Sequence, residues 1–210
     1  NNSNYNFEII NGNYEITIRN ATIDYGTLVY DYNSQDYFTE IKPTLTNVVE
    51  KDKNSFVFEL YKDGNLTTEF KNAGSYELIL ADNSIFNNYI INKTQETYTI
   101  NPKDITLKPK YIEKNYNQLL SFSDFAVENV TLAGHDTLEN IAKIEFEVYE
   151  NSNLLNDISK LNVGSYEVAL KLTSADLYDN YNITLLNNEL RINKRETYVS
   201  AQNIEKIYDE

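Results

Sequence analysis

The chain has 210 residues, a formal net charge of −14 at pH 7, and neither cysteine nor methionine. The lack of cysteine excludes disulfides and thiolate sites, and the single histidine, His135, excludes a multi-histidine metal centre. The acidic balance disfavours nucleic acid and anionic membranes as partners, and no apolar run is long enough to insert into a membrane. Because methionine is absent, we expect the chain to be an internal piece of a longer protein or a processed one.

Alternation of apolar and polar residues with a period of two predicts β-strands along the whole chain. The clearest segments, in chain order, are 14–18, 76–80, 144–148 and 166–172. One face of each strand is expected to pack inward while the other meets water, as in antiparallel sheets. A short helix is predicted at 136–142, with Asp136 as the N-cap and Glu139 completing a capping box.

The sequence repeats itself. An Asn-Tyr segment occurs at 4–9, 88–91 and 180–185, and an Asn-x-Gly-Ser-Tyr-Glu segment occurs at 72–77 and 162–167. The repeat markers are Tyr32, Tyr116, Tyr208, Gly74 and Gly164. Each glycine precedes a predicted strand, and either a turn with positive φ or a close backbone approach would explain it.

These repeated segments and marker residues divide the chain into four parts. Segments 19–102 and 103–194 are predicted to be complete repeats; 1–18 is the expected end of a preceding repeat and 195–210 the start of a following one. A repeat of roughly 90 residues can bury a core. The predicted fold is mostly β, with each repeat forming a β-grasp-like sheet or an Ig-like sandwich. Because no Pro-rich or Gly/Ser-rich linker separates them, the repeats are predicted to lie end to end as a rod.

Four segments, taken in order, resemble the MBG-type repeats, which occur with the related YDG repeats in large bacterial surface proteins and adhesins. The segments are 134–137, 162–166, 180–183 and 190–195. The family signature opens with Tyr-Gly or Tyr-Asp-Gly, whereas this chain has Tyr-Asn at 32–33 and 116–117 and Tyr-Asp at 208–209. The resemblance implies a mostly-β extracellular module, serial in a stalk at the bacterial cell surface or cell wall, without a known catalytic site.

Groups that could carry chemistry are sparse. His135 beside Asp136 would need a nucleophile from elsewhere to act as a catalytic base, and the simpler interpretation is an exposed residue beside a helix start. The aspartates and asparagines that could offer oxygen ligands to calcium are Asp31, Asn33, Asp36, Asp176, Asp179 and Asn180. None has EF-hand spacing, so a solvated acidic surface is favoured. We therefore predict no enzyme, no cofactor and no metal site.

Tyrosines are the remaining candidates for ligand contact, because exposed aromatic rings dominate many binding surfaces. Those predicted to pack in the core or at a sheet edge are Tyr5, Tyr76, Tyr89, Tyr166 and Tyr181. Those on predicted outward faces are Tyr25, Tyr30, Tyr61 and Tyr149. Within the second group, only Tyr61 and Tyr149 occupy matching places in the two repeats.

Two functions fit these features. In the first, the repeats are non-catalytic spacers whose partners are the neighbouring repeats of the same chain, and they hold a distal domain away from the cell. In the second, each repeat binds a host glycan or surface protein weakly, and the array gains strength through multivalency.

Overall fold

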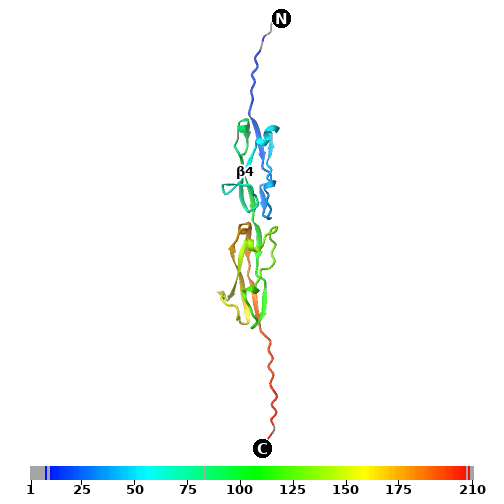
Figure 1. The fold of residues 1–210 in the computed structure, drawn as a ribbon, viewed down its shortest axis with the longest axis vertical. Helices are drawn as coiled ribbons and strands as arrows, with labels where there is room; N and C mark the ends of the chain where they lie inside the picture. The colour runs from blue at the N-terminus through cyan, green and yellow to red at the C-terminus, as the bar shows by residue number, and fades with distance from the viewer. Residues whose placement is uncertain (1–7, 9, 83, 207, 209–210) are drawn as a thin grey trace. The chain divides into compact units, whose positions relative to one another are not determined.

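The computed structural model describes residues 8, 10–82, 84–206 and 208, and it is mostly β, as predicted (Figure 1). The chain divides into two compact units. The first comprises Asn1–Asp31 and Gln35–Asn101, and the second comprises Tyr32–Ser34 and Pro102–Glu210. The predicted division between 102 and 103 lies one residue from the start of Pro102–Glu210.

The first unit contains two sheets. Its strands are β1 Arg19–Asp24, β2 Val29–Asp31, β3 Thr44–Thr46, β4 Phe58–Lys62, β5 Asn65–Thr67, β6 Gly74–Leu80, β7 Tyr89–Ile91 and β8 Gln95–Asn101. The larger sheet has the order β2-β8-β6-β4-β5 and the smaller one β3-β1-β7. Three 3-10 helices connect them: η1 Phe38–Glu40, η2 Glu50–Ser55 and η3 Ser84–Asn88.

The second unit repeats this plan. Its strands are β9 Lys103–Leu107, β10 Ile112–Asn115, β11 Ala142–Glu150, β12 Asn153–Leu154, β13 Gly164–Ser174, β14 Tyr181–Leu185 and β15 Asn188–Asn193. The sheets have the orders β10-β15-β13-β11-β12 and β14-β9. Its helices are η4 Phe122–Asp124, α1 Leu138–Ile141 and η5 Tyr178–Asn180.

The two units share the order, direction and register of their strands. β2 pairs in parallel with β8, and β10 pairs in parallel with β15. Gly74 lies opposite Ile100 and Gly164 lies opposite Ile192, so the repeated glycines hold the same position. The counterpart of β3 is reduced to an isolated bridge between Pro109 and Val127. The two segments with recurring sequence therefore have the same fold.

Of the two predicted architectures, the sandwich is the one observed. Both sheets of the first unit bury alternate side chains: Ala21 and Ile23 from β1, and Leu78 and Leu80 from β6. In the described chain the only α-helix is α1, and its four residues are too few to cover a sheet as a β-grasp helix would. The end-to-end arrangement as a rod remains a prediction.

Aromatic rings fill the core of the first unit. Phe70 is completely buried, and its ring makes edge-to-face contacts with Tyr76 and Tyr98 at centroid separations of 4.7 Å and 5.9 Å. Edge-to-face pairs of this kind add stability beyond the area that they bury. In the second unit the buried cluster is mostly aliphatic, and it comprises Leu120, Phe125, Val148, Ile158, Tyr166, Val168, Leu190 and Ile192.

The strand prediction was right at 76–80, 144–148 and 166–172, which lie in β6, β11 and β13. It was wrong at 14–18, where no strand forms and the apolar side chains are exposed. The matching segment of the first repeat lies in β8, which is hydrogen-bonded between β2 and β6. Alternation alone does not make a strand where the described chain offers no partner for its backbone groups.

The helix prediction was wrong in its extent and its cap. α1 covers only Leu138–Ile141, and β11 begins at Ala142. The N-cap is Thr137, whose side chain accepts a hydrogen bond from the Asn140 backbone N–H at 3.4 Å. Asp136 lies one residue before this N-cap, and its Oδ2 accepts hydrogen bonds from the hydroxyls of Tyr32 and Tyr181.

The repeated glycines differ in conformation. Gly74 has φ = +129°, so a positive φ explains it. Gly164 lies outside the left-handed region, and a Cβ built there would make only an ordinary contact of 3.9 Å with the Tyr166 ring. Neither predicted explanation accounts for glycine at 164.

Replacing Phe70 with alanine is expected to lower the free energy of unfolding of the first unit by about 3–5 kcal/mol, because it removes a fully buried ring. Hydrogen exchange of the amides of β6 and β8 measures the loss. The control is Phe38→Ala at an exposed ring, for which a change within about 1 kcal/mol is expected. Equal effects of the two substitutions would contradict the assigned core.

Candidate functional site

Tyr61 and Tyr149, the predicted ligand-facing aromatics, occupy equivalent positions on the larger sheets. On β4, Tyr61 lies between Leu66 of β5 and Glu77 of β6. On β11, Tyr149 has the equivalent neighbours on β12 and β13, Leu154 and Glu167. Directly opposed residues share one face of a sheet, so the same three side chains meet in both units.

A carboxylate on the same strand completes each group. The Tyr61 hydroxyl donates to Glu59 Oε2 at 2.7 Å, and the Tyr149 hydroxyl donates to Glu147 Oε2 at the same distance. These hydrogen bonds are the main reason why the pKa of each tyrosine is raised. We call these groups the tyrosine patches: Glu59, Tyr61, Leu66 and Glu77 in the first unit, and Glu147, Tyr149, Leu154 and Glu167 in the second.

The patches lie where a ligand can reach them. β5 and β12 are edge strands, and Leu66 and Leu154 are 63% and 48% exposed. The ring and the leucine offer apolar contact, and the carboxylates can accept hydrogen bonds from sugar hydroxyls or from ammonium and guanidinium groups. The two leucines were missed by sequence reasoning, although their 88-residue spacing equals that of the tyrosines.

Tyr25 and Tyr30 were predicted to face outward, but both pack against other parts of the first unit. Tyr25 is buried, and its hydroxyl donates to the Lys93 carbonyl at 3.1 Å. Tyr30 packs against the rings of Tyr37 and Phe70 at centroid separations of 4.7 Å and 5.3 Å. A burial pattern read from one strand could not anticipate these contacts, because Lys93 and Phe70 are distant in the sequence and Tyr37 lies in the loop after β2.

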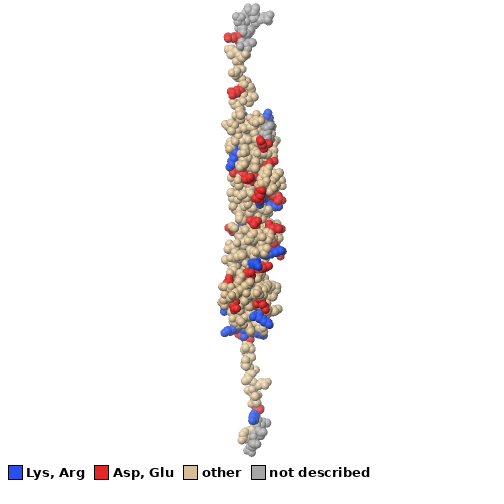
Figure 2. All heavy atoms as spheres, turned by 90° about the vertical axis from the view of Figure 1, so that its left-hand side faces the viewer, with Lys and Arg blue, Asp and Glu red and all other residues tan. Residues whose placement is uncertain are grey.

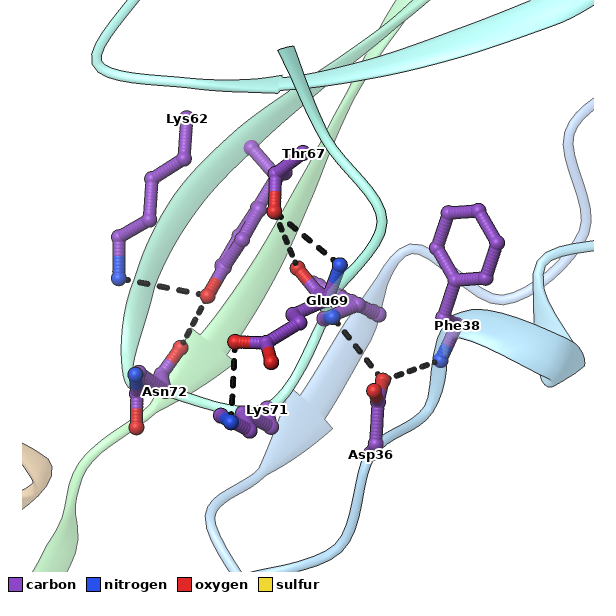
Figure 3. Close-up of polar contacts among 9 residues, drawn as sticks. Asp36, Phe38, Lys62, Thr67, Glu69, Lys71 and Asn72 are labelled. Carbon is purple, nitrogen blue, oxygen red and sulfur yellow. Dashed lines mark hydrogen bonds and ion pairs between the residues drawn. The ribbon is translucent and has the colours of Figure 1, made fainter. Parts of the chain in front are cut away.

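The packing tyrosines make the same hydrogen bond in both Asn-x-Gly-Ser-Tyr segments. The Tyr76 hydroxyl donates to the Asn72 carbonyl at 2.9 Å, and the Tyr166 hydroxyl donates to the Asn162 carbonyl at the same distance. In each case a buried ring closes the loop that precedes its own strand. The Lys62 Nζ also donates a hydrogen bond to the Tyr76 hydroxyl at 3.3 Å, and it lies 4.8 Å from the centre of the Tyr76 ring. The Lys62 side chain and this hydrogen bond are drawn in Figure 3.

Asp36 holds backbone groups of two loops in place. Its Oδ1 accepts hydrogen bonds from the Phe38 and Phe70 backbone N–H groups at 2.9 Å and 3.0 Å (Figure 3). Asp31 Oδ1 likewise accepts from the Asn101 side chain at 3.1 Å. Nowhere in the described ranges do three or more His, Cys, Asp or Glu side chains form a group that could hold a metal ion.

A second recurring feature pairs a buried tyrosine with an aspartate. In the first unit the Tyr89 hydroxyl donates to Asp52 Oδ2 at 2.7 Å and accepts from the Val49 backbone N–H at 3.1 Å. In the second unit the Tyr181 hydroxyl donates to Asp136 Oδ2 at 2.6 Å and accepts from the Ala133 backbone N–H at 3.0 Å. We call Tyr89–Asp52 and Tyr181–Asp136 the tyrosine–aspartate pairs.

The three marker tyrosines lie in different surroundings. Tyr32, which belongs to the second unit, is 5% exposed; its hydroxyl donates to Asp136 Oδ2 at 2.9 Å and its ring lies edge-to-face with Tyr181 at 5.5 Å. Tyr116 is 47% exposed and Tyr208 is 87% exposed. Sequence reasoning treated these residues as equivalent markers, whereas only Tyr32 is buried against an aspartate.

Charges are dispersed on the molecular face drawn in Figure 2, where acidic side chains are scattered among basic and uncharged ones. His135 is exposed, in agreement with the simpler of its two interpretations. None of the helices in the described part of the chain is long and apolar enough to span a membrane.

No protein family model matches the chain, and no curated protein matches its sequence. Among solved structures, fibronectin(III)-like modules of Clostridium thermocellum CbhA are 11% identical, with 87% of this chain and 100% of that chain covered and a TM-score of 0.27. A tandem pair of Ig domains of titin is 8% identical, with 80% and 93% covered and a TM-score of 0.24. Likeness at this level establishes no family.

The second unit is expected to lose stability at alkaline pH. Burial, followed by the hydrogen bond to Asp136, raises the pKa of Tyr181 to about 12 and also raises that of Tyr32. Tyrosine in an unfolded chain titrates near pH 10, so the stability linked to Tyr181 is complete below about pH 10 and is lost as the pH rises toward 12.

Urea unfolding between about pH 9 and pH 11, followed by the methyl NMR signals of Val168 and Leu190, measures this loss. Tyr181→Phe removes one titrating hydroxyl and is expected to make the loss shallower. Tyr198→Phe, at a 92% exposed ring, serves as the matched control. A pH dependence left unchanged by Tyr181→Phe would contradict the assignment.

Proposed function

We propose that this chain is a non-catalytic repeat module that acts as a spacer in a bacterial surface adhesin. The observation that carries the proposal is the duplicated fold: two units with the same strand order and register. Repetition of one fold along a chain is typical of proteins that gain length or several copies of one surface from it. The MBG resemblance supports the bacterial cell surface as its location.

The pairing of the strands suits a module that bears tension. In each unit the last strand of the larger sheet is paired in parallel with a strand from the beginning of the unit: β8 with β2, and β15 with β10. Tension applied to the two ends of a unit pulls parallel neighbours past each other along their length. The hydrogen bonds between them are then loaded together instead of opening one after another.

The spacer proposal predicts an extended particle. A compact globule of this length would have a radius of gyration of about 17 Å. Small-angle scattering of the 210-residue chain is expected to give a clearly larger value and an interatomic distance distribution with a long tail. A symmetrical distribution near the compact value would contradict the proposal.

The tyrosine patches support a second candidate, a weak adhesive module. The recurrence concerns four side chains in one register, and two of them, Leu66 and Leu154, are exposed apolar residues at a sheet edge. Such a patch would take a host glycan or a basic segment of a host surface protein. Weak binding to each copy would gain strength in series.

A screen of the immobilised chain against glycans, mucins and matrix proteins tests this candidate. Alanine at both Tyr61 and Tyr149 is expected to weaken binding by about 30-fold or more, as at a tyrosine hot spot. Tyr198→Ala is the control, since that ring is exposed outside both patches. Binding that survives the double substitution would show that the tyrosine patches are not the binding site. If the unchanged chain binds nothing, the spacer role is the one remaining candidate.

A further inference from the structure

The tyrosine patch of the second unit continues across its sheet. Glu167 of β13 lies directly opposite Glu189 of β15. Tyr111 stands one residue before β10, where the parallel register of β10 and β15 places it next to Glu189. Opposed residues share one face of a sheet, so these side chains follow a line from β12 to the start of β10. We call this line the cross-sheet row: Leu154, Tyr149, Glu167, Glu189 and Tyr111.

The first unit has the beginning of this row but not its continuation. Glu77, the counterpart of Glu167, lies opposite Thr97 of β8, so threonine takes the place of Glu189. Thr27 stands 84 residues before Tyr111 and takes the place of that ring. The first unit is therefore an internal reference, because a ligand that needs the second carboxylate and the second ring distinguishes the two units.

The centre of the row carries negative charge that its neighbours only partly balance. Glu167 and Glu189 face each other on adjacent strands, an arrangement that is destabilising for like charges. Arg191 lies 3.6 Å from Glu189, and it also donates to the Ser165 hydroxyl at 2.6 Å. Within the described chain no basic side chain forms an ion pair with Glu167, whose hydrogen bond comes from the neutral Asn187 amide. A cation placed over the two carboxylates would relieve their repulsion.

An aromatic ring stands at each end of this pair of carboxylates. Tyr149 lies beside Glu167 and is half-buried, while Tyr111 lies beside Glu189 and is 50% exposed. Burial, and then the negative charges of Glu113 and Glu189, raise the pKa of Tyr111. Ring faces attract ammonium and guanidinium groups. Three strand spacings of about 4.8 Å separate the two rings, which places them about 14 Å apart.

We propose that the cross-sheet row binds an extended segment of a basic protein that carries Lys or Arg at every second residue. Alternate residues of an extended chain point to one side at intervals of about 6.7 Å, so three of them span about 13 Å, close to the separation of the rings. The outer two cations lie at Tyr149 and Tyr111, and the middle one lies over Glu167 and Glu189. This inference rests on the adhesive role proposed above and names its ligand class for the second unit.

Two peptides of equal composition and charge test the proposal. Acetyl-Lys-Ser-Lys-Ser-Lys-amide has alternating lysines, and acetyl-Lys-Lys-Lys-Ser-Ser-amide does not. Each is titrated into the 15N-labelled chain. The alternating peptide is expected to shift the amide signals of Glu167, Glu189 and Tyr111 saturably and to bind about threefold more tightly than the other, the gain from one more cation at a ring face. The signals of Glu77 and Thr97 are expected to move less.

Two substitutions assign the binding to the row. Glu167→Gln removes one charge but keeps an oxygen for the Asn187 hydrogen bond, so it is expected to raise the urea midpoint of the free second unit while weakening the alternating peptide about threefold. Tyr111→Thr copies the first unit and is expected to weaken the peptide by a similar factor. Tyr198→Thr, at an exposed ring outside the row, is the matched control. Amide spectra verify the fold of each variant.

Equal affinity for the two peptides would overturn the proposal, because the net charge of −14 would then explain the attraction. Shifts of equal size in the first unit, or binding that both substitutions leave unchanged, would also overturn it. If a neutral glycan binds in the screen and neither peptide binds, this proposal fails while the adhesive candidate stands. The scattering test of the spacer role is independent of all these results.

Discussion

Every buried tyrosine ring brings a hydroxyl that must find a partner, and the structure depends on how these hydroxyls are satisfied. An unpaired buried hydroxyl costs about 1–3 kcal/mol, and within the described residues no buried side-chain polar atom lacks a hydrogen bond. The partners come from the segments between strands: the Asn72 carbonyl for Tyr76, the Lys93 carbonyl for Tyr25, and the carboxylate of Asp52 in η2 for Tyr89. The rings stabilise the sheets by burial, while their hydroxyls hold the loops against those sheets. A chain without cysteine or tryptophan obtains its cross-connections in this way.

The same constraint explains what varies between the units and what does not. Tyr76 and Tyr166 donate the same hydrogen bond to the loop before their strand, so the tyrosine and its spacing from that loop are the same in both units. Opposite them, Tyr98 in the first unit is matched by Leu190 in the second, which needs no partner. The Tyr98 hydroxyl donates to the Tyr25 carbonyl, a bond that a leucine cannot make. The more aromatic core of the first unit and the mostly aliphatic core of the second are thus two ways of filling the same fold.

The proposed roles use different parts of that fold. In the spacer role the parallel pairs β2–β8 and β10–β15 would carry tension, whereas in the adhesive role ligand contact is assigned to the edge beside β5 and β12. A module can therefore act as a spacer whether or not its patches bind a ligand.

From the sequence alone, the period-two alternation predicted three of the principal strands, and the recurrence of short segments predicted two repeats. The alternation is a local signal, and the recurrence compares one part of the sequence with another. Neither therefore requires knowledge of tertiary contacts. The outward position of Tyr61 and Tyr149 followed from the same alternation, but the leucines beside them did not, because cross-strand neighbours depend on register. The choice of sandwich over β-grasp, the burial of Tyr25 and the role of Asp136 depended on tertiary structure. Each is decided by groups far apart in the chain: Asp136 has the sequence of a helix cap, yet its carboxylate is taken by the Tyr181 hydroxyl 45 residues away.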